Sequence, residues 1–127
     1  MRGEQTKINR TRKLNVGGKK FETKAAVLNY LNVVAEKDNT FIDRDPELFR
    51  WLLMYARNRY NYYKEKLDKG INLNGLALYT QEEKLYAFLP YHNKELMKQI
   101  MNEAHYYGLS SLQEHIQQEI SKKNKKE

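Results

Sequence analysis

The strongest constraint in this sequence is a pair of adjacent glycines, Gly17 and Gly18, placed between two short segments of alternating character. The residues that recur there at every second position are Leu14, Val16, Phe21 and Thr23. Period-two alternation on both sides of a two-glycine turn is typical of a β-hairpin. The sequence therefore predicts two antiparallel strands, the first beginning at Lys13, with one face against a core.

The same glycines are followed by Lys19 and Lys20, which raises the question of a phosphate-binding loop. A Walker-type loop has a glycine five positions before its Gly-Lys pair and a Ser or Thr directly after it. Lys13 and Lys20 occupy those two positions here. The dinucleotide pattern G-x-G-x-x-G also fails, because the two glycines are adjacent and no third one follows nearby. We interpret the pair as a turn.

After Thr23 the apolar spacing changes from period two to the spacing of a helix. The predicted buried face of that helix consists of Val27, Leu28, Leu31 and Val34. Thr23 is the expected N-cap. The polar stretch from Glu36 to Thr40 predicts a loop, and Phe41 and Ile42 predict a short buried strand that follows it.

Asp45, Pro46 and Glu47 form a helix start. An aspartate caps the first free amides, proline suits the first helical position, and glutamate complements the helix dipole. The predicted buried stripe of this helix is Phe49, Leu52, Leu53 and Ala56, flanked by Trp51 and Tyr55.

Residues 58–88 permit several arrangements. The helix can continue to a stop at Gly70, and a hairpin around Asn74-Gly75 can follow it. A second register pairs the strand LALY with the strand LYAF. A third arrangement starts a helix at Thr80, which has capping-box spacing with Glu83. We favour strands for the segment after Gly70.

Beyond Pro90, helical spacing predicts a helix from Lys94 to Tyr107, closed by Gly108, and then a last helix. Ser110 with Gln113, or Ser111 with Glu114, offers a capping box for that last helix. The expected buried faces are Leu96, Ile100, Ala104 and Tyr107, beside Met97 and Met101, and then Leu112, Ile116 and Ile120. Strands followed by a run of helices predict an α+β fold with helices packed on a small sheet.

Composition narrows the function classes. At 127 residues the chain fits one domain, and its ten tyrosines suit a subunit whose surface is partly covered by copies of itself. There is no cysteine, which excludes a disulfide or a thiolate zinc site. No signal-peptide or membrane-spanning run is apparent, so we expect a cytoplasmic protein, with the nucleus as the alternative and no membrane partner.

The residues offer no catalytic or cofactor-binding constellation. The three histidines, His92, His105 and His115, lack metal-ligand spacing, and His105 reads as a structural histidine at the end of a packed helix. Ser110 and Ser111 lack a nucleophile elbow and have an adequate role as caps. We therefore expect a non-enzyme with no cofactor and no metal.

Two features leave nucleic-acid binding open. The net charge of +7 is concentrated at the two chain ends, and the stretch RNRYNYYKEK interleaves aromatic and cationic residues as single-strand platforms do. The alternative interpretation is a helix whose tyrosine rings pack inward while Arg57, Arg59, Lys64 and Lys66 stay in solvent. We favour this alternative, so nucleic acid is a minor candidate partner.

Three stretches, in this order, resemble the BTB/POZ domain of the potassium-channel tetramerisation type: LNVGGKKFET, FIDRDPELFRWLLMYAR and EAHYYGLSSLQEHI. The family pattern runs L-N-V-G-G-x-x-F-x-T, then F-x-D-R-D-P/G with a helix, then E-A-x-Y-Y-x-L-x-x-L. The matching positions are 14–23, 41–46 and 103–112. The resemblance implies a BTB/POZ fold with a small mixed sheet flanked by a helical cluster.

The resemblance also sets the expected domain organisation. A flexible basic N-terminus covers residues 1–12, the BTB/POZ domain covers 13–120, and a basic tail covers 121–127. Residues 58–80 look like an insertion in that domain.

Self-association is the function that the resemblance implies. Such domains are not enzymes and form rings of usually four or five copies through polar flanks, so we expect a homo-tetramer or homo-pentamer. Asp43, Arg44 and Asp45 match the family motif and carry both charge signs, and we predict that they lie in the interface. The intramolecular alternative pairs the two aspartates with Arg44 and uses Asp45 mainly as a helix cap.

Soluble relatives that resemble this chain also recruit a cullin scaffold. An adaptor for a cullin-RING ubiquitin ligase, or a decoy that competes with larger adaptors, is therefore an alternative function. The chain has no cysteine for the zinc cluster found between subunits in several channel classes, and we expect neither a channel body nor a substrate-binding domain after Ile120.

Overall fold

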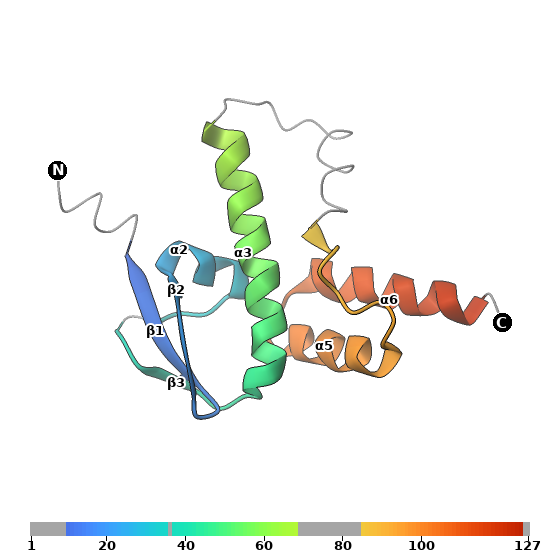
Figure 1. Cartoon of the computed structure of the whole chain (residues 1–127), viewed down its shortest axis with the longest axis horizontal. Helices are drawn as coiled ribbons and strands as arrows, with labels where there is room; N and C mark the ends of the chain where they lie inside the picture. Colours follow the sequence, from blue (N-terminus) through green and yellow to red (C-terminus); the bar gives the residue numbers. More distant parts are fainter. Residues whose placement is uncertain (1–9, 36, 69–84, 126–127) are drawn as a thin grey trace.

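The computed structural model describes residues 10–35, 37–68 and 85–125 (Figure 1). A three-stranded sheet lies on one side of a long central helix, and two further helices lie on its other side. The order of the strands in the sheet is β2-β1-β3. This mixed sheet with its helical cluster confirms the predicted α+β architecture.

The predicted hairpin is present. Strand β1 (Thr11–Val16) pairs antiparallel with β2 (Lys19–Lys24), with Leu14 opposite Phe21. Strand β1 starts two residues earlier than expected, because the cross-strand pairing extends to Thr11 and Lys24. Leu14 and Val16 are buried, as the alternation predicts.

The third strand, β3 (Thr40–Ile42), pairs parallel with β1 at the edge of the sheet. The prediction that Phe41 is buried is wrong, because its side chain is 59% exposed. Neighbouring residues of a strand point to opposite faces, and Ile42 is the one that packs against the core.

Helix α2 (Ala25–Leu28) and the 3₁₀ turn η1 (Asn29–Leu31) bury Val27, Leu28 and Leu31 as predicted. Thr23 does not cap α2. It is a buried residue of β2, and Lys24 occupies the cap position without a side-chain hydrogen bond. Val34 follows the left-handed residue Asn32, where the helical spacing has ended, and is exposed rather than buried.

The long helix α3 (Pro46–Asp68) begins at Pro46 as expected. Its buried stripe contains the predicted Phe49, Leu52, Leu53 and Ala56, and also Tyr55, which was expected only beside the stripe. The predicted stop at Gly70, the hairpin at Asn74-Gly75 and the helix start at Thr80 lie outside the described residues. The favoured strand at LYAF is wrong, because Leu85 is helical and residues 86–88 form a turn. Leu85, Tyr86 and Leu89 are buried together at helical spacing, which a strand would split between two faces.

Helix α5 (Lys94–Tyr106) starts at Asn93, whose Oδ1 accepts a hydrogen bond from the Leu96 amide at 3.1 Å. Helix α6 (Ser110–Lys125) follows Gly108, which has φ +71°. The Leu109 carbonyl accepts the first bond of α6, from Gln113 N, so Ser110 is the first helical residue rather than the predicted cap. Helix α6 buries Leu112, Ile116 and Ile120 as expected and continues to Lys125, into the segment that was expected to be a basic tail. None of the described helices is long and apolar enough to cross a membrane.

Candidate protein-interaction surface

The two glycines of the hairpin serve different purposes. Gly17 has φ +57°, and a Cβ there would collide with the Arg44 carbonyl oxygen and lie 2.9 Å from Pro46 Cδ. Gly18 has φ +97° but open space around it. Both amides are already used, since Gly17 N donates to Ile42 O at 2.9 Å and Gly18 N donates to Asn15 Oδ1 at 2.8 Å. A phosphate would have to displace these bonds, which agrees with the turn interpretation.

Asp45 closes the N-terminus of α3. Its Oδ1 accepts hydrogen bonds from the amides of Glu47, at 2.8 Å, and Leu48, at 3.4 Å. The side chain thus satisfies amides that the helix itself leaves free. The predicted capping role of Asp45 is confirmed.

Arg44 forms an ion pair with Glu103 of helix α5, which lies 59 residues further along the chain. Its Nη2 donates to Glu103 Oε1 at 2.7 Å and its Nε donates to Glu103 Oε2 at 3.0 Å, so the ion pair is bidentate. The Glu103 side chain is only 6% exposed and that of Arg44 is 33% exposed. The hydrogen bond with Glu103 raises the pKa of the Arg44 guanidinium above its ordinary value.

Tyr106 also contacts Arg44, because its ring centroid lies 3.9 Å from the guanidinium carbon of Arg44. Cationic guanidinium groups are attracted to the faces of aromatic rings at such distances. The intramolecular alternative for Arg44 therefore needs a correction, since its charge partner is Glu103 and not Asp43 or Asp45. Asp43 itself is exposed. The three motifs of the sequence thus meet at one place, through Gly17, Arg44 and Glu103.

A groove of about 480 Å³ opens beside Tyr106 and the Arg44 side chain that it contacts. It is lined by residues 32–34, 40–42 and 106–107, which come from the end of η1, from β3 and from the end of α5. Asn32 joins two of these segments by donating from Nδ2 to Tyr107 O at 2.8 Å. The groove is therefore built from three parts of the chain that hydrogen bonds and an ion pair hold in place.

The rim of the groove combines polar residues, such as Asn32 and Thr40, with exposed apolar side chains. Three of the four large hydrophobic residues that are exposed among the described residues line it: Val34 at 78%, Phe41 at 59% and Tyr106 at 57%. Single exposed apolar residues are common, but a cluster in one concave surface marks a place where another molecule can pack. We call this surface the β3 groove.

Sequence reasoning missed the β3 groove, although it found the segment next to it. Phe41 and Val34 were both expected in the core, and the charged residues Asp43, Arg44 and Asp45 were expected at the surface that neighbours contact. A signal was available in Asn32, because asparagine tolerates the left-handed conformation that ends a helix, and it precedes Val34. For Tyr106 the helical spacing was the signal, because it places Tyr107 rather than Tyr106 on the buried face of the helix.

The tyrosine-rich part of α3 forms a cluster of its own. Arg59 donates from Nη1 to Tyr55 Oη at 2.9 Å, and its guanidinium lies 5.3 Å from the Tyr63 ring centroid and 5.7 Å from that of Tyr30. The expectation that Arg59 stays in solvent is wrong, because these rings surround it and leave it half-buried. The aromatic and cationic groups of this stretch therefore contact one another.

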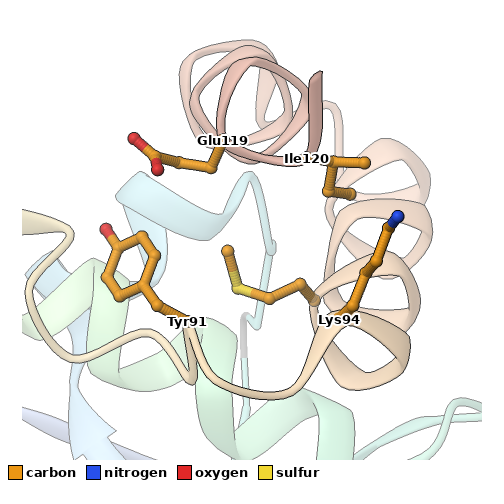
Figure 2. Close-up of a pocket in the computed structure, with 5 residues that line it drawn as sticks. Tyr91, Lys94, Glu119 and Ile120 are labelled. Atoms are coloured by element: carbon orange, nitrogen blue, oxygen red, sulfur yellow. The ribbon is translucent and has the colours of Figure 1, made fainter. Parts of the chain in front are cut away.

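A small cavity lies between helix α6 and the first turn of α5 with the segment that precedes it (Figure 2). Its volume is about 10 Å³, which is close to the space of one water molecule, and Tyr91, Lys94, Met97, Glu119 and Ile120 line it. Burial raises the pKa of Tyr91 to about 12, so its hydroxyl stays neutral. This cavity is a feature of packing and is too small for a ligand.

The histidines lie at different places in the domain and do not share a site. His115 stacks on Tyr86, with ring centroids 4.0 Å apart, and its Nε2 lies 2.9 Å from Tyr91 Oη. His105 lies exposed in the last turn of α5, and its Nδ1 is 3.3 Å from Gln113 Nε2, which agrees with the expected structural role. Within the described residues, no group of three or more His, Cys, Asp or Glu is placed to hold a metal ion.

Comparison with known proteins adds one finding. A family model described as the BTB/POZ domain matches residues 13–88, which is more than half of the chain. No curated protein and no solved structure matches this chain.

Proposed function

This chain belongs to the BTB/POZ domain family of the potassium-channel tetramerisation type, and from that membership we propose that it is an interaction module that assembles with copies of itself. BTB/POZ domains are generally interaction modules rather than enzymes. The observation that carries the proposal for this particular chain is the β3 groove, where three exposed apolar side chains lie beside the residues of the family motif.

The hydrogen bonds and the ion pair that hold the groove support this role. Binding loses less free energy to ordering when the contact surface is fixed in advance. Here the Arg44–Glu103 pair fixes the chain after β3 to α5, and the Asn32 bond to the Tyr107 carbonyl fixes the segment after η1. The surface is thus already formed in a single copy of the chain.

The position of the charges supports self-association. Asp43 lies directly after β3 and is exposed, while Arg44 is one-third exposed at the same edge. Polar groups at the rim of an apolar patch orient a partner and exclude wrong ones. We therefore keep Asp43, Arg44 and Asp45 as proposed interface residues, with Arg44 and Asp45 also holding the fold within each copy.

The test is the mass of the purified full-length chain in solution. Light scattering coupled to size exclusion at tens of micromolar should give a discrete multiple of the 15.2 kDa chain mass, four-fold or five-fold. A single species of 15.2 kDa at that concentration would contradict self-assembly. The purified chain suffices for this test, because assembly with itself needs no second protein.

A further inference from the structure

A hollow of about 310 Å³ lies where the end of β2, helix α2 and helix α3 meet (Figure 1). Strand β2 is the edge of the sheet opposite to β3, so the hollow is separate from the β3 groove. Two of its lining residues, Lys24 and Arg57, are cations, and none of the described residues that line it is acidic. We call it the Tyr60 hollow, after the aromatic ring in its wall.

Two lysines flank the Tyr60 ring. The Nζ of Lys24 lies 5.4 Å from the ring centroid, and the Nζ of Lys64 lies 5.8 Å from it. Such distances allow a cation to interact with the ring face. In the part of the chain that the structure describes, neither lysine has a carboxylate partner. Their charges are therefore available to an anion.

Arg57 is fixed in the wall of the hollow by hydrogen bonds to β2. Its Nη2 donates to the Glu22 carbonyl at 3.0 Å, and its Nε donates to Thr23 Oγ1 at 3.4 Å. Both acceptors are uncharged, so they position the guanidinium without neutralising it. Nη1 has no partner among the described residues and can donate to a ligand. A cation positioned in advance loses less free energy to ordering when an anion binds.

Glu22 is the carboxylate that follows from the sequence next to this site. Its Oε2 accepts a hydrogen bond from Thr11 Oγ1 at 2.8 Å. The strand register places Glu22 opposite Lys13, and opposed residues of paired strands have their side chains on the same face. Glu22 thus has a cation of its own across the strands, and the Tyr60 hollow keeps an excess of positive charge.

This charge and this shape favour a phosphate group. A phosphate monoester carries a charge of about −2 near neutral pH and has three acceptor oxygens, whereas a carboxylate carries a single charge. Arg57 and Lys64 are seven residues apart on α3, so they lie on the same side of the helix, and Asn61 lies between them in the wall of the hollow. Its side-chain amide is a further donor.

The size of the hollow limits the ligand. Sites for small molecules range from roughly 300 to 1,000 Å³, and the Tyr60 hollow lies near the lower end of that range. It can hold one phosphate group with a small organic group attached. Val27 contributes an apolar part of the wall, against which such a group can pack.

We propose that the Tyr60 hollow binds the phosphate monoester group of a small molecule, with Arg57, Lys24 and Lys64 contacting the phosphate oxygens. Val27 contacts the organic part. The site does not depend on self-assembly, because every residue that forms it comes from one copy of the chain.

The test is isothermal titration calorimetry of the full-length chain with phenyl phosphate, at low ionic strength and pH 7.5. We expect saturable binding with one site per chain. Benzoate has the same ring with a singly charged group and should bind about tenfold more weakly. Added salt should weaken the binding of phenyl phosphate, because the lysines are at the surface.

Variants locate the binding site. Lys24→Gln and Lys64→Gln should each lower the affinity for phenyl phosphate by about fivefold, the effect of losing one charge in a solvent-exposed contact. Arg57→Gln also removes the two bonds to β2, so the two lysine variants carry the test. The matched control is Arg50→Gln, which removes an exposed cation about two turns earlier on α3 and outside the hollow. It should bind as the unchanged chain does, and circular dichroism establishes that each variant is folded.

Three outcomes would overturn the proposal. The absence of saturable binding at low ionic strength would show that the hollow is not a phosphate site. An equal loss of affinity in Arg50→Gln and in the lysine variants would assign the binding to the net charge of +7 rather than to the hollow. Benzoate binding as tight as that of phenyl phosphate would contradict the preference for phosphate.

Discussion

The two edges of the sheet are tied to the rest of the domain in different ways. The β3 edge is held by the hydrogen bond from the Gly17 amide to the Ile42 carbonyl and by the bidentate ion pair of Arg44 with the buried Glu103. The β2 edge is held by contacts that lie in solvent, such as the Lys19–Glu47 pair at 3.0 Å, whose side chains are 50% and 65% exposed. Buried pairs lose much when one partner is removed, whereas exposed pairs lose little.

This contrast explains where the sequence is most restricted. At the β3 edge, Gly17 has no room for a side chain beside the Arg44 carbonyl. Arg44 and Glu103 each have the other as their charged partner, so neither is easily replaced. At the β2 edge several residue types can serve, because water can replace an exposed partner at little cost. The predictions below test this contrast, beginning with the largest expected effect.

Replacing Gly17 by alanine should lower the free energy of unfolding by about 3 kcal/mol, because the left-handed backbone and the contact with the Arg44 carbonyl both oppose a Cβ. Gly18→Ala should cost about 1 kcal/mol, since only the backbone conformation opposes it. Urea unfolding of the two variants measures the difference. Equal costs would mean that the close approach of the hairpin to Arg44 is unimportant.

Replacing Glu103 by glutamine should lower the melting temperature on the order of 5 °C, because Arg44 then loses its charged partner in a largely buried place. The exposed pair provides the comparison, with Lys19→Gln expected to leave the melting temperature almost unchanged. Differential scanning calorimetry compares both variants with the unchanged chain. A larger effect for Lys19 would reverse the contrast between the two edges.

Replacing Asp45 by alanine should cost about 1 kcal/mol, because the first amides of α3 lose their acceptor. Asp45→Asn should retain most of that stability, since the amide oxygen of asparagine also caps helices. Urea unfolding midpoints at neutral pH separate the two variants. Equal losses for both would indicate that the charge matters rather than the cap.

The smallest effect concerns Glu47 and depends on pH. The hydrogen bond with Lys19 lowers the pKa of Glu47 below its ordinary value of 4.5, so the ionised form is favoured in the folded protein. The resulting stabilisation is present above the unfolded pKa and is lost as the pH falls through the lowered folded pKa. Glu47→Gln should therefore lower the unfolding midpoint slightly at pH 7 and leave it unchanged at a pH below both values. A difference that persists in acid would contradict the assignment.

The local features of the fold were accessible from the sequence, whereas the groove was not. The glycine turn and the Asp45 cap depend on residues within a few positions of each other, and both signals are specific. The Arg44–Glu103 pair joins residues 59 positions apart, so no periodicity reveals it. Phe41 was assigned to the wrong face because a three-residue strand has too short an alternation to show which side is buried.

The segment LYAF shows the same limit. A short apolar run is consistent with a strand or with a buried helical turn, and only its surroundings decide between them. Here Tyr86 packs against Tyr55 of α3 and His115 of α6, with ring centroids 5.9 Å and 4.0 Å apart. Those contacts require the packed helices, which local propensity does not describe.

The central claim is that the chain assembles through the β3 groove. The most direct measurement is native mass spectrometry of the unchanged chain, of Phe41→Glu and of the matched control Gln118→Glu, which introduces the same charge on the exposed side of α6. The account predicts that the unchanged chain and the control give the same ring and that Phe41→Glu, still folded, gives mainly single copies. A Phe41→Glu chain that forms the ring as readily as the control would contradict it.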